Sequence, residues 1–139
     1  MSRARSRART AEALVALAAA SVLRRLLPMP RWAWLVGRPG VAPAEVRPQA
    51  PRPGRDRDVA LALRSADRRL PWPTTCLDRA VAGQLLLRRR GRPGTLVIGL
   101  DRADVTAVPH AWLMAGDAVL VGGEVMGGYV PTTAFTVTG

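Results

Sequence analysis

Two side chains of this 139-residue chain could act together as a nucleophile and a base. Cys76 is the only cysteine and His110 is the only histidine. A thiolate is a strong nucleophile, and an imidazole within hydrogen-bond reach can take up the thiol proton and later return it to a leaving group. The pair favours chemistry at a carbonyl carbon, provided that the fold brings the two side chains together.

Cys76 stands where a helix is predicted to start. Thr74 or Thr75 is a suitable N-cap, Asp78 falls in the first turn, and three arginines occupy the last turn of a helix over residues 76–90. Backbone N–H groups and the positive end of the helix dipole favour a thiolate at this position, and the same donors can stabilise an oxyanion.

His110 begins a predicted strand over residues 110–114, which a turn joins to a partner strand over residues 119–123. The alternation of a strand places His110, Trp112 and Met114 on one side of it.

The third member of a catalytic triad is less clear. An acidic residue on the return strand would normally orient the imidazole, but that strand reads AVLVGG. Asp117 in the turn and Glu124 just past the strand are the two candidates, and a backbone carbonyl is the third option.

The remaining elements give an α+β chain. Thr10 can cap a helix over residues 11–27, preceded by a disordered basic arm over residues 1–9. Helical and strand patterns also predict a helix over residues 55–70 and a buried strand over residues 95–100. The tail that begins at Tyr129 either adds an edge strand or packs loosely. In the first helix the predicted apolar stripe consists of Val15, Ala19, Val22, Leu23 and Leu26.

Proline content divides the chain. Residues 39–54 hold five prolines and are predicted to be a linker. The basic arm and N-terminal helical segment occupy residues 1–38, and the segment with the candidate chemistry occupies residues 55–139.

Composition limits the function classes. The net charge of +11 comes from arginine alone, since the chain has no lysine, and this bias together with the scarcity of aromatic residues argues against a nucleic-acid partner. A lone cysteine cannot form an internal disulfide, and one cysteine with one histidine supplies two of the four ligands of a structural zinc site. We expect no metal and no other cofactor.

The N-terminus offers two alternatives to a cytoplasmic location. SRARSRAR before ALVALAAASVL is similar to the charged and apolar regions of a secretory signal, but no clean cleavage site follows. The apolar run of about eleven residues is too short to span a bilayer, so an amphipathic helix resting weakly on a membrane is the other alternative. We expect a cytoplasmic protein, with weak membrane association as a further expectation.

Two segments carry a family resemblance. CLDRAVAGQLLLRRRGRPGTLVIGL (76–100) and HAWLMAGDAVLVGG (110–123) resemble the C-terminal domain of the lasso-peptide leader peptidases, stand-alone maturation proteases of the transglutaminase-like cysteine protease superfamily. The shared pattern is a Cys-Leu-x-Arg-Ala helix, a Leu-Leu-Arg-Arg-Arg-Gly helix end, a Leu-Val-Ile-Gly strand and His-Ala-Trp before a turn. VLRRLLPMPRWAWLVGR (22–38) is similar to the family's leading segment, so only the arm and the linker are left unmatched.

The resemblance implies a small papain/transglutaminase-like core, in which the cysteine-bearing helix packs on an antiparallel sheet. It also implies a cysteine peptidase that removes the leader from a ribosomally synthesised lasso precursor peptide, with Cys76 as nucleophile and His110 as proton shuttle. The implied partners are the precursor, a separate leader-recognition protein and a macrolactam synthetase. The family usually offers an aspartate on the strand after His-Ala-Trp, and this chain departs from that pattern.

Two other function classes stay open. A weak or inactive module of the same fold would bind and position the precursor without cleaving it, as the missing acid suggests. A basic helical protein resting on a membrane or a nucleic acid would use the arm and the first helix.

Overall fold

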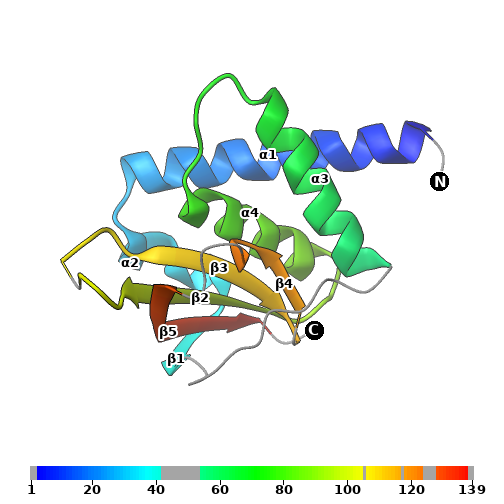
Figure 1. The fold of residues 1–139 in the computed structure, drawn as a ribbon. Coiled ribbons are helices and arrows are strands. Elements are labelled where there is room, and N and C mark those ends of the chain that lie inside the picture. The colour runs from blue at the N-terminus through cyan, green and yellow to red at the C-terminus, as the bar shows by residue number, and fades with distance from the viewer. Residues whose placement is uncertain (1–2, 42–53, 105, 117, 124–127, 138–139) are drawn as a thin grey trace.

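The computed structural model describes residues 3–41, 54–104, 106–116, 118–123 and 128–137. The fold is α+β, with a five-stranded antiparallel sheet that carries a layer of helices on one face (Figure 1). The helices are α1 (Arg3–Leu26), α2 (Met29–Trp32), the 3-10 helix η1 (Ala33–Val36), α3 (Arg55–Arg69) and α4 (Cys76–Arg89). The strands are β1 (Arg38–Val41), β2 (Gly94–Asp101), β3 (His110–Ala115), β4 (Ala118–Val121) and β5 (Tyr129–Val137).

The last strand in the sequence lies inside the sheet. The strand order is β1-β5-β2-β3-β4, and β5 pairs antiparallel with both β1 and β2. The expectation of an edge strand or a loosely packed tail is therefore wrong. β1 and β4 are the edge strands of the described sheet, and β1 contains Pro39, which an edge position tolerates because one side of the strand needs no ladder hydrogen bonds.

The two faces of β3 follow the predicted alternation. Ala111 and Leu113 belong to the main hydrophobic core beneath the helices. Trp112 and Met114 belong to a smaller cluster with Val97. The period of two along a strand produces this separation. His110, the first residue of β3, is half-buried.

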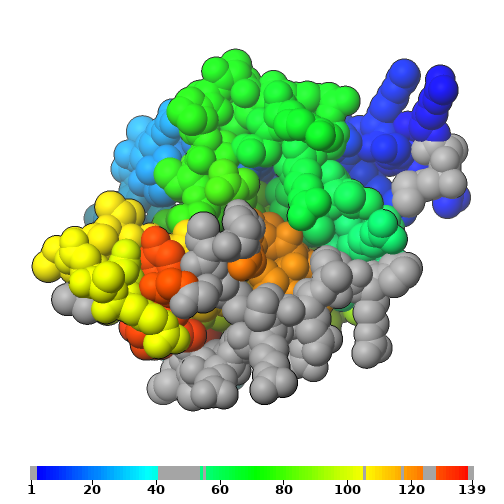
Figure 2. Space-filling view, in the orientation of Figure 1, coloured from blue at the N-terminus to red at the C-terminus, as the bar shows by residue number. Residues whose placement is uncertain are grey.

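The helical layer has α4 at its centre. α4 packs on β2 and β3, while α1 and α3 pack on α4 and on each other. In the space-filling view, the loop before β3, shown in yellow, projects at one side of the molecule (Figure 2). One core cluster joins α1, η1, α3, α4 and the sheet, so residues on both sides of the proline-rich segment share it. Residues 42–53 of that segment lie outside the described residues.

α1 differs from the prediction at its start. The helix begins at Arg3, so a disordered arm over residues 1–9 is wrong from that residue onward. Arginine and alanine are good helix formers, and a helix that packs on another along its length gains stability that an isolated segment lacks. The Arg9–Asp58 ion pair, at 3.0 Å, joins this first part of α1 to α3.

α1 also buries a different face from the one predicted. Ala13, Leu17 and Ala20 are buried, whereas Val15 and Leu26 are 71% and 75% exposed. An alanine-rich helix offers two apolar faces, and the face with small side chains lets α3 and α4 approach closely. The predicted stripe is thus largely a surface feature. No helix in the described part of the chain is long and apolar enough to cross a bilayer.

Candidate active site

Thr75 fixes the start of α4. Its hydroxyl accepts a hydrogen bond from the backbone N–H of Asp78 at 3.1 Å, and its own N–H donates to the Asp78 carboxylate at 3.0 Å. This reciprocal capping box satisfies two backbone groups that would otherwise lack partners at the helix start. Of the two threonines predicted as caps, Thr75 is the one used, and Cys76 is the first residue of the helix.

Asp78 also anchors α4 to α1. Its side chain is buried, and Arg24 donates to it through Nε at 2.5 Å and Nη2 at 3.2 Å. The hydrogen bond to Asp78 raises the pKa of Arg24 above its ordinary value. A carboxylate that both caps a helix and pairs with a guanidinium can be buried, because its charge is compensated by these partners.

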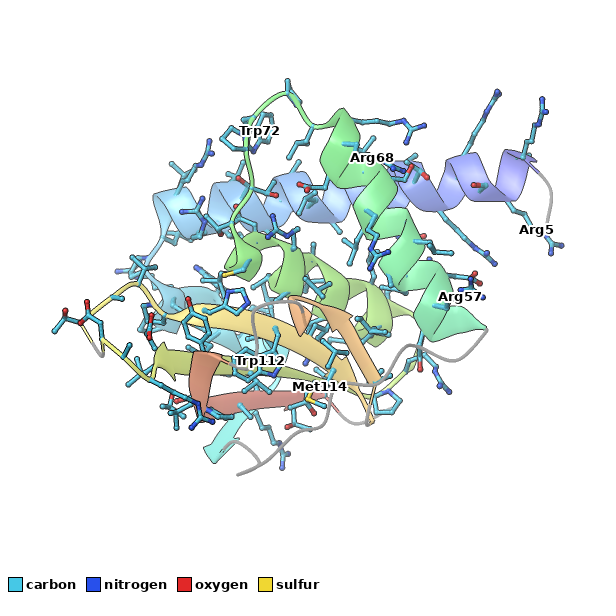
Figure 3. All side chains as sticks on the ribbon, in the orientation of Figure 1. Arg5, Arg57, Arg68, Trp72, Trp112 and Met114 are labelled. Carbon is cyan, nitrogen blue, oxygen red and sulfur yellow. The ribbon has the colours of Figure 1, made fainter. Side chains whose placement is uncertain are left out.

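The segment between α3 and α4 is held by side chains on both of its sides. Arg79 donates to the Thr74 carbonyl at 3.2 Å, and Thr74 in turn donates to Asp67 of α3. Trp72 donates to the Ser21 hydroxyl of α1 at 3.0 Å, and Figure 3 shows Trp72 on the loop that leads into α4. These contacts fix the direction from which the chain reaches Cys76.

The sulfur of Cys76 faces the first residues of β3. Its Sγ accepts a hydrogen bond from the backbone N–H of Ala111 at 3.4 Å. That nitrogen is bonded to the carbonyl carbon of His110, so the sulfur lies beside the backbone of the histidine. Cys76 is half-buried and therefore still reachable from solvent. The fold brings the two predicted residues to one place although 34 positions separate 76 from 110.

The imidazole of His110 is held by a backbone carbonyl and two aromatic rings. Nε2 lies 3.3 Å from the carbonyl oxygen of Gly122. The ring centroid is 5.0 Å from that of Tyr129 and 6.1 Å from that of Trp112. If Nε2 carries the hydrogen and donates a hydrogen bond to the Gly122 carbonyl oxygen, Nδ1 has a free lone pair with which to accept another proton.

Gly122 is a site residue that the sequence reasoning missed. Its φ of +81° lies in the left-handed region, and a Cβ there would come within 2.8 Å of the Ala111 carbonyl oxygen and 3.3 Å of His110 Nε2. Only glycine lets the chain turn after β4 and place its carbonyl against the imidazole. The Gly-Gly pair at the end of the return strand is the signal that would have found it.

The predicted acidic members stay predictions. Asp117 and Glu124 both lie outside the described residues. The third option, a backbone carbonyl near the imidazole, is the contact that Gly122 makes.

The arrangement combines the elements of acyl transfer. A thiol sits on the first residue of a helix, where the N–H groups of the first turn have no helical partners. An additional N–H, from Ala111, points at the sulfur. An imidazole with an orienting acceptor on one nitrogen stands at the start of the adjacent strand. Donors of this kind are fixed before any substrate binds, which is the condition for stabilising an oxyanion effectively.

Comparison with known families gives one match. The sequence model of a family described as the transglutaminase-like superfamily matches residues 13–138. The match begins at the buried Ala13 of α1 and ends one position after β5. It therefore includes Cys76, His110, Arg24 and Gly122. Neither the curated proteins nor the solved structures give a match.

Proposed function

Because the chain belongs to the transglutaminase-like superfamily, we propose that it is a cysteine peptidase that removes the leader from a ribosomally synthesised lasso precursor peptide. Cys76 is the nucleophile and His110 the general base and acid. The peptidase acts with a separate leader-recognition protein that grips the precursor, and a macrolactam synthetase then uses the released core.

One observation carries the proposal. The sulfur of Cys76 lies 3.4 Å from the backbone nitrogen that follows His110, and the imidazole of His110 has a backbone acceptor, the Gly122 carbonyl, at its Nε2. A buried structural cysteine would need neither a helix N-terminus nor a nearby imidazole. The finer assignment, to lasso precursors, is supported by the ordered set of motifs from Cys76 to Gly123.

The proposed reaction has two half-reactions. His110 Nδ1 takes the thiol proton as Sγ attacks the scissile carbonyl carbon, and first-turn N–H groups of α4 stabilise the resulting oxyanion. The imidazolium then donates its proton to the leaving amine, and the C–N bond breaks to give a thioester. Water, deprotonated by His110, attacks the thioester, which releases the new carboxyl terminus and restores the thiol.

The direct test is cleavage of the precursor peptide. The protein, its leader-recognition partner and the precursor are incubated together, and the products are identified by mass spectrometry. We expect Cys76→Ala to abolish cleavage while the precursor still binds. Cleavage that persists in this variant contradicts the proposal, whereas binding without cleavage by the unaltered protein supports the reading as an inactive positioning module.

A second proposal is that α1 rests weakly on an anionic membrane. The exposed side chains of Val15, Val22 and Leu26 lie on one helical face, and the exposed arginines of residues 3–7 precede them. Basic residues beside an exposed apolar face favour adsorption at an anionic lipid surface.

Sedimentation with phosphatidylglycerol vesicles tests the membrane proposal. We expect the double variant Val15→Ser/Leu26→Ser to lose vesicle binding, and phosphatidylcholine vesicles to bind neither protein. Unchanged sedimentation of the double variant, or equal binding to the two lipids, contradicts this proposal. Leu61→Ser on α3, another exposed leucine, is the matched control.

A further inference from the structure

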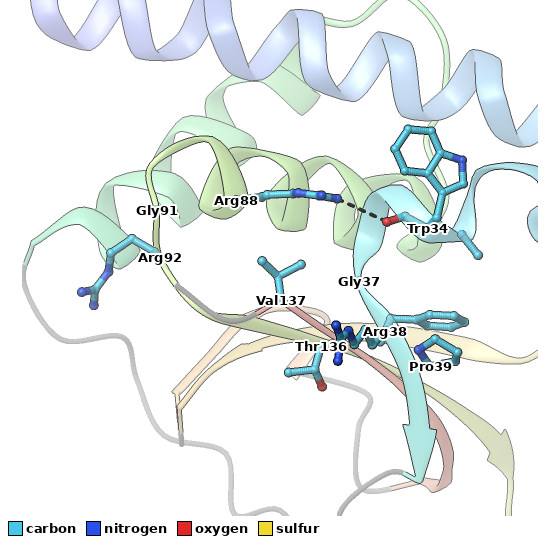
Figure 4. Close-up of a pocket in the computed structure, with 11 residues that line it drawn as sticks. Trp34, Gly37, Arg38, Pro39, Arg88, Gly91, Arg92, Thr136 and Val137 are labelled. Carbon is cyan, nitrogen blue, oxygen red and sulfur yellow. Dashed lines mark hydrogen bonds between the residues drawn. The ribbon is translucent and has the colours of Figure 1, made fainter.

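The end of α4 that is remote from Cys76 borders an open cleft. Its volume is about 820 Å³, and its lining comes from η1, β1, the residues after α4 and the end of β5 (Figure 4). α4 has 14 residues. Arg88, which lines the cleft, comes 12 residues after Cys76, so at 1.5 Å per residue the helix places the cleft roughly 18 Å from the start of α4. The cleft is therefore separate from the candidate active site.

Three arginines line this cleft. Arg92 is paired with Asp56 through two contacts of 3.2 and 3.1 Å. Arg88 donates from Nη1 to the carbonyls of Trp34 and Leu35, at 3.2 and 2.9 Å, so its guanidinium is held in place without a carboxylate.

Arg38 completes the set. It is exposed on the edge strand β1, and within the described residues its guanidinium has neither an ion pair nor a hydrogen bond. Two of the three positive charges are thus available to an anionic ligand.

The walls between the arginines are apolar. Phe135 and Val137 of β5 contribute to the lining together with Trp34, which is 66% exposed. A nucleic-acid strand presents continuous phosphate charge and would stack its bases on exposed aromatic rings, but of the two aromatic residues in the lining Phe135 is buried and only Trp34 is exposed. Carboxylate side chains that alternate with apolar ones match this lining better, because guanidinium groups bind carboxylates while the apolar neighbours are removed from water.

Buried contacts hold together the backbone segments that carry the lining of the cleft. The buried amide nitrogen Nε2 of Gln84 lies 2.7, 3.0 and 3.1 Å from the carbonyl oxygens of Val36, Gly94 and Phe135, so its two hydrogens are shared among three acceptors. At Gly37 a Cβ would lie 2.3 Å from the Thr136 carbonyl oxygen, so β5 packs directly against the chain entering β1. A preformed cleft loses little conformational entropy when a ligand binds.

We propose that this cleft binds an acidic peptide segment through Arg38 and Arg88. Under the proposed peptidase function, on which this step rests, the segment belongs to the substrate. An extended peptide rises about 3.3 Å per residue, so the acidic side chains would stand at least six or so residues from the scissile bond. The cleft would then hold the peptide while its scissile bond lies at Cys76.

Fluorescence anisotropy with a labelled peptide of alternating glutamate and leucine tests this proposal. The Cys76→Ala protein is used, so that binding is measured without turnover. We expect Arg38→Glu to weaken binding at least about tenfold, as the loss of a charge-assisted hydrogen bond implies. Arg68→Glu is the matched control, since it changes the net charge equally at an exposed site on α3 (Figure 3), a helix that contributes no residue to the lining of the cleft. We expect less than a twofold effect from it.

Three outcomes decide the matter. Equal weakening by the two variants overturns the proposal, because binding would then follow net charge alone. Arg38-dependent binding of an RNA oligonucleotide at least as tight as that of the peptide overturns the assignment to an acidic peptide. Arg38-dependent peptide binding by a protein that cleaves no precursor supports the cleft and overturns only the peptidase. Thermal unfolding of Arg38→Glu checks that this variant is folded. Binding by Arg38→Lys checks that the positive charge at this position is what the peptide requires.

Discussion

The two halves of α4 are each tied down by one buried polar side chain, but by different means. At the first end Asp78 caps the helix and pairs with the charged side chain of Arg24 from α1. Farther along the helix, in its second half, Gln84 shares the two hydrogens of its Nε2 among three backbone carbonyls. The end with the thiol therefore depends on the identity of a side chain distant in the sequence. The end with the arginine-lined cleft depends mainly on the path of the backbone.

The two ends of α4 therefore have different proposed roles, bond cleavage at the first end and peptide binding at the far end. The first end presents N–H donors, a thiol and an imidazole, and within the described residues its one buried carboxylate is neutralised by Arg24. The far end presents guanidinium groups between apolar walls. Variants at the first end should change the rate of bond cleavage, and variants at the far end should change binding.

The variant His110→Ala should sharpen the comparison most. Removing a general base and acid costs about 10²- to 10⁴-fold in rate, so we expect kcat for precursor cleavage to fall by that factor with little change in KM. Arg38→Glu should instead raise KM for the precursor with little change in kcat. Equal effects of the two variants on kcat would contradict the division of roles.

The variant Arg24→Ala should break the anchor at the first end. It leaves the Asp78 carboxylate buried without its cation, so we expect the free energy of unfolding, measured in urea, to drop by about 3 kcal/mol. Arg68→Ala, an exposed arginine on α3, should change it by less than about 0.5 kcal/mol. A drop as small as that of the control would show that the pair contributes little.

The variant Gly122→Ala should have a selective effect on activity. Its positive φ costs about 1–2 kcal/mol, and the added Cβ pushes on the imidazole. Gly116→Ala is the matched control, because its φ is +61° and a Cβ there meets nothing within 4 Å. We expect Gly122→Ala to be destabilised more than the control, because its added Cβ would lie 2.8 Å from the Ala111 carbonyl oxygen, and only Gly122→Ala to lose kcat. Equal loss of kcat would remove the orienting role from the Gly122 carbonyl.

Local signals gave the elements that carry the candidate site. The threonine cap, the acid in the first turn and the arginines in the last turn predicted α4, and the period of two predicted the two faces of β3. These features depend on residues a few positions apart, so the sequence alone reveals them.

The features that were missed depend on contacts between distant parts of the chain. Arg24 and Asp78 are 54 positions apart, and neither position reveals the other. The face that α1 buries was decided by the close approach of α3 and α4 to small side chains, against the larger Val15 and Leu26. The placement of β5 follows from the pairing of the whole sheet, which no single segment encodes.

The place of β5 has a consequence for when the protein becomes active. A chain is made from its N-terminus, so the segment with Cys76 leaves the ribosome well before Tyr129 is added. Until that last strand inserts, β1 has no neighbour, β2 lacks one of its two, and the imidazole of His110 lacks the ring that lies 5.0 Å from it. Such pairing between distant segments forms late in folding. A nascent chain would therefore carry an exposed thiol without an assembled site, and the order of synthesis would delay its activity until the sheet is complete.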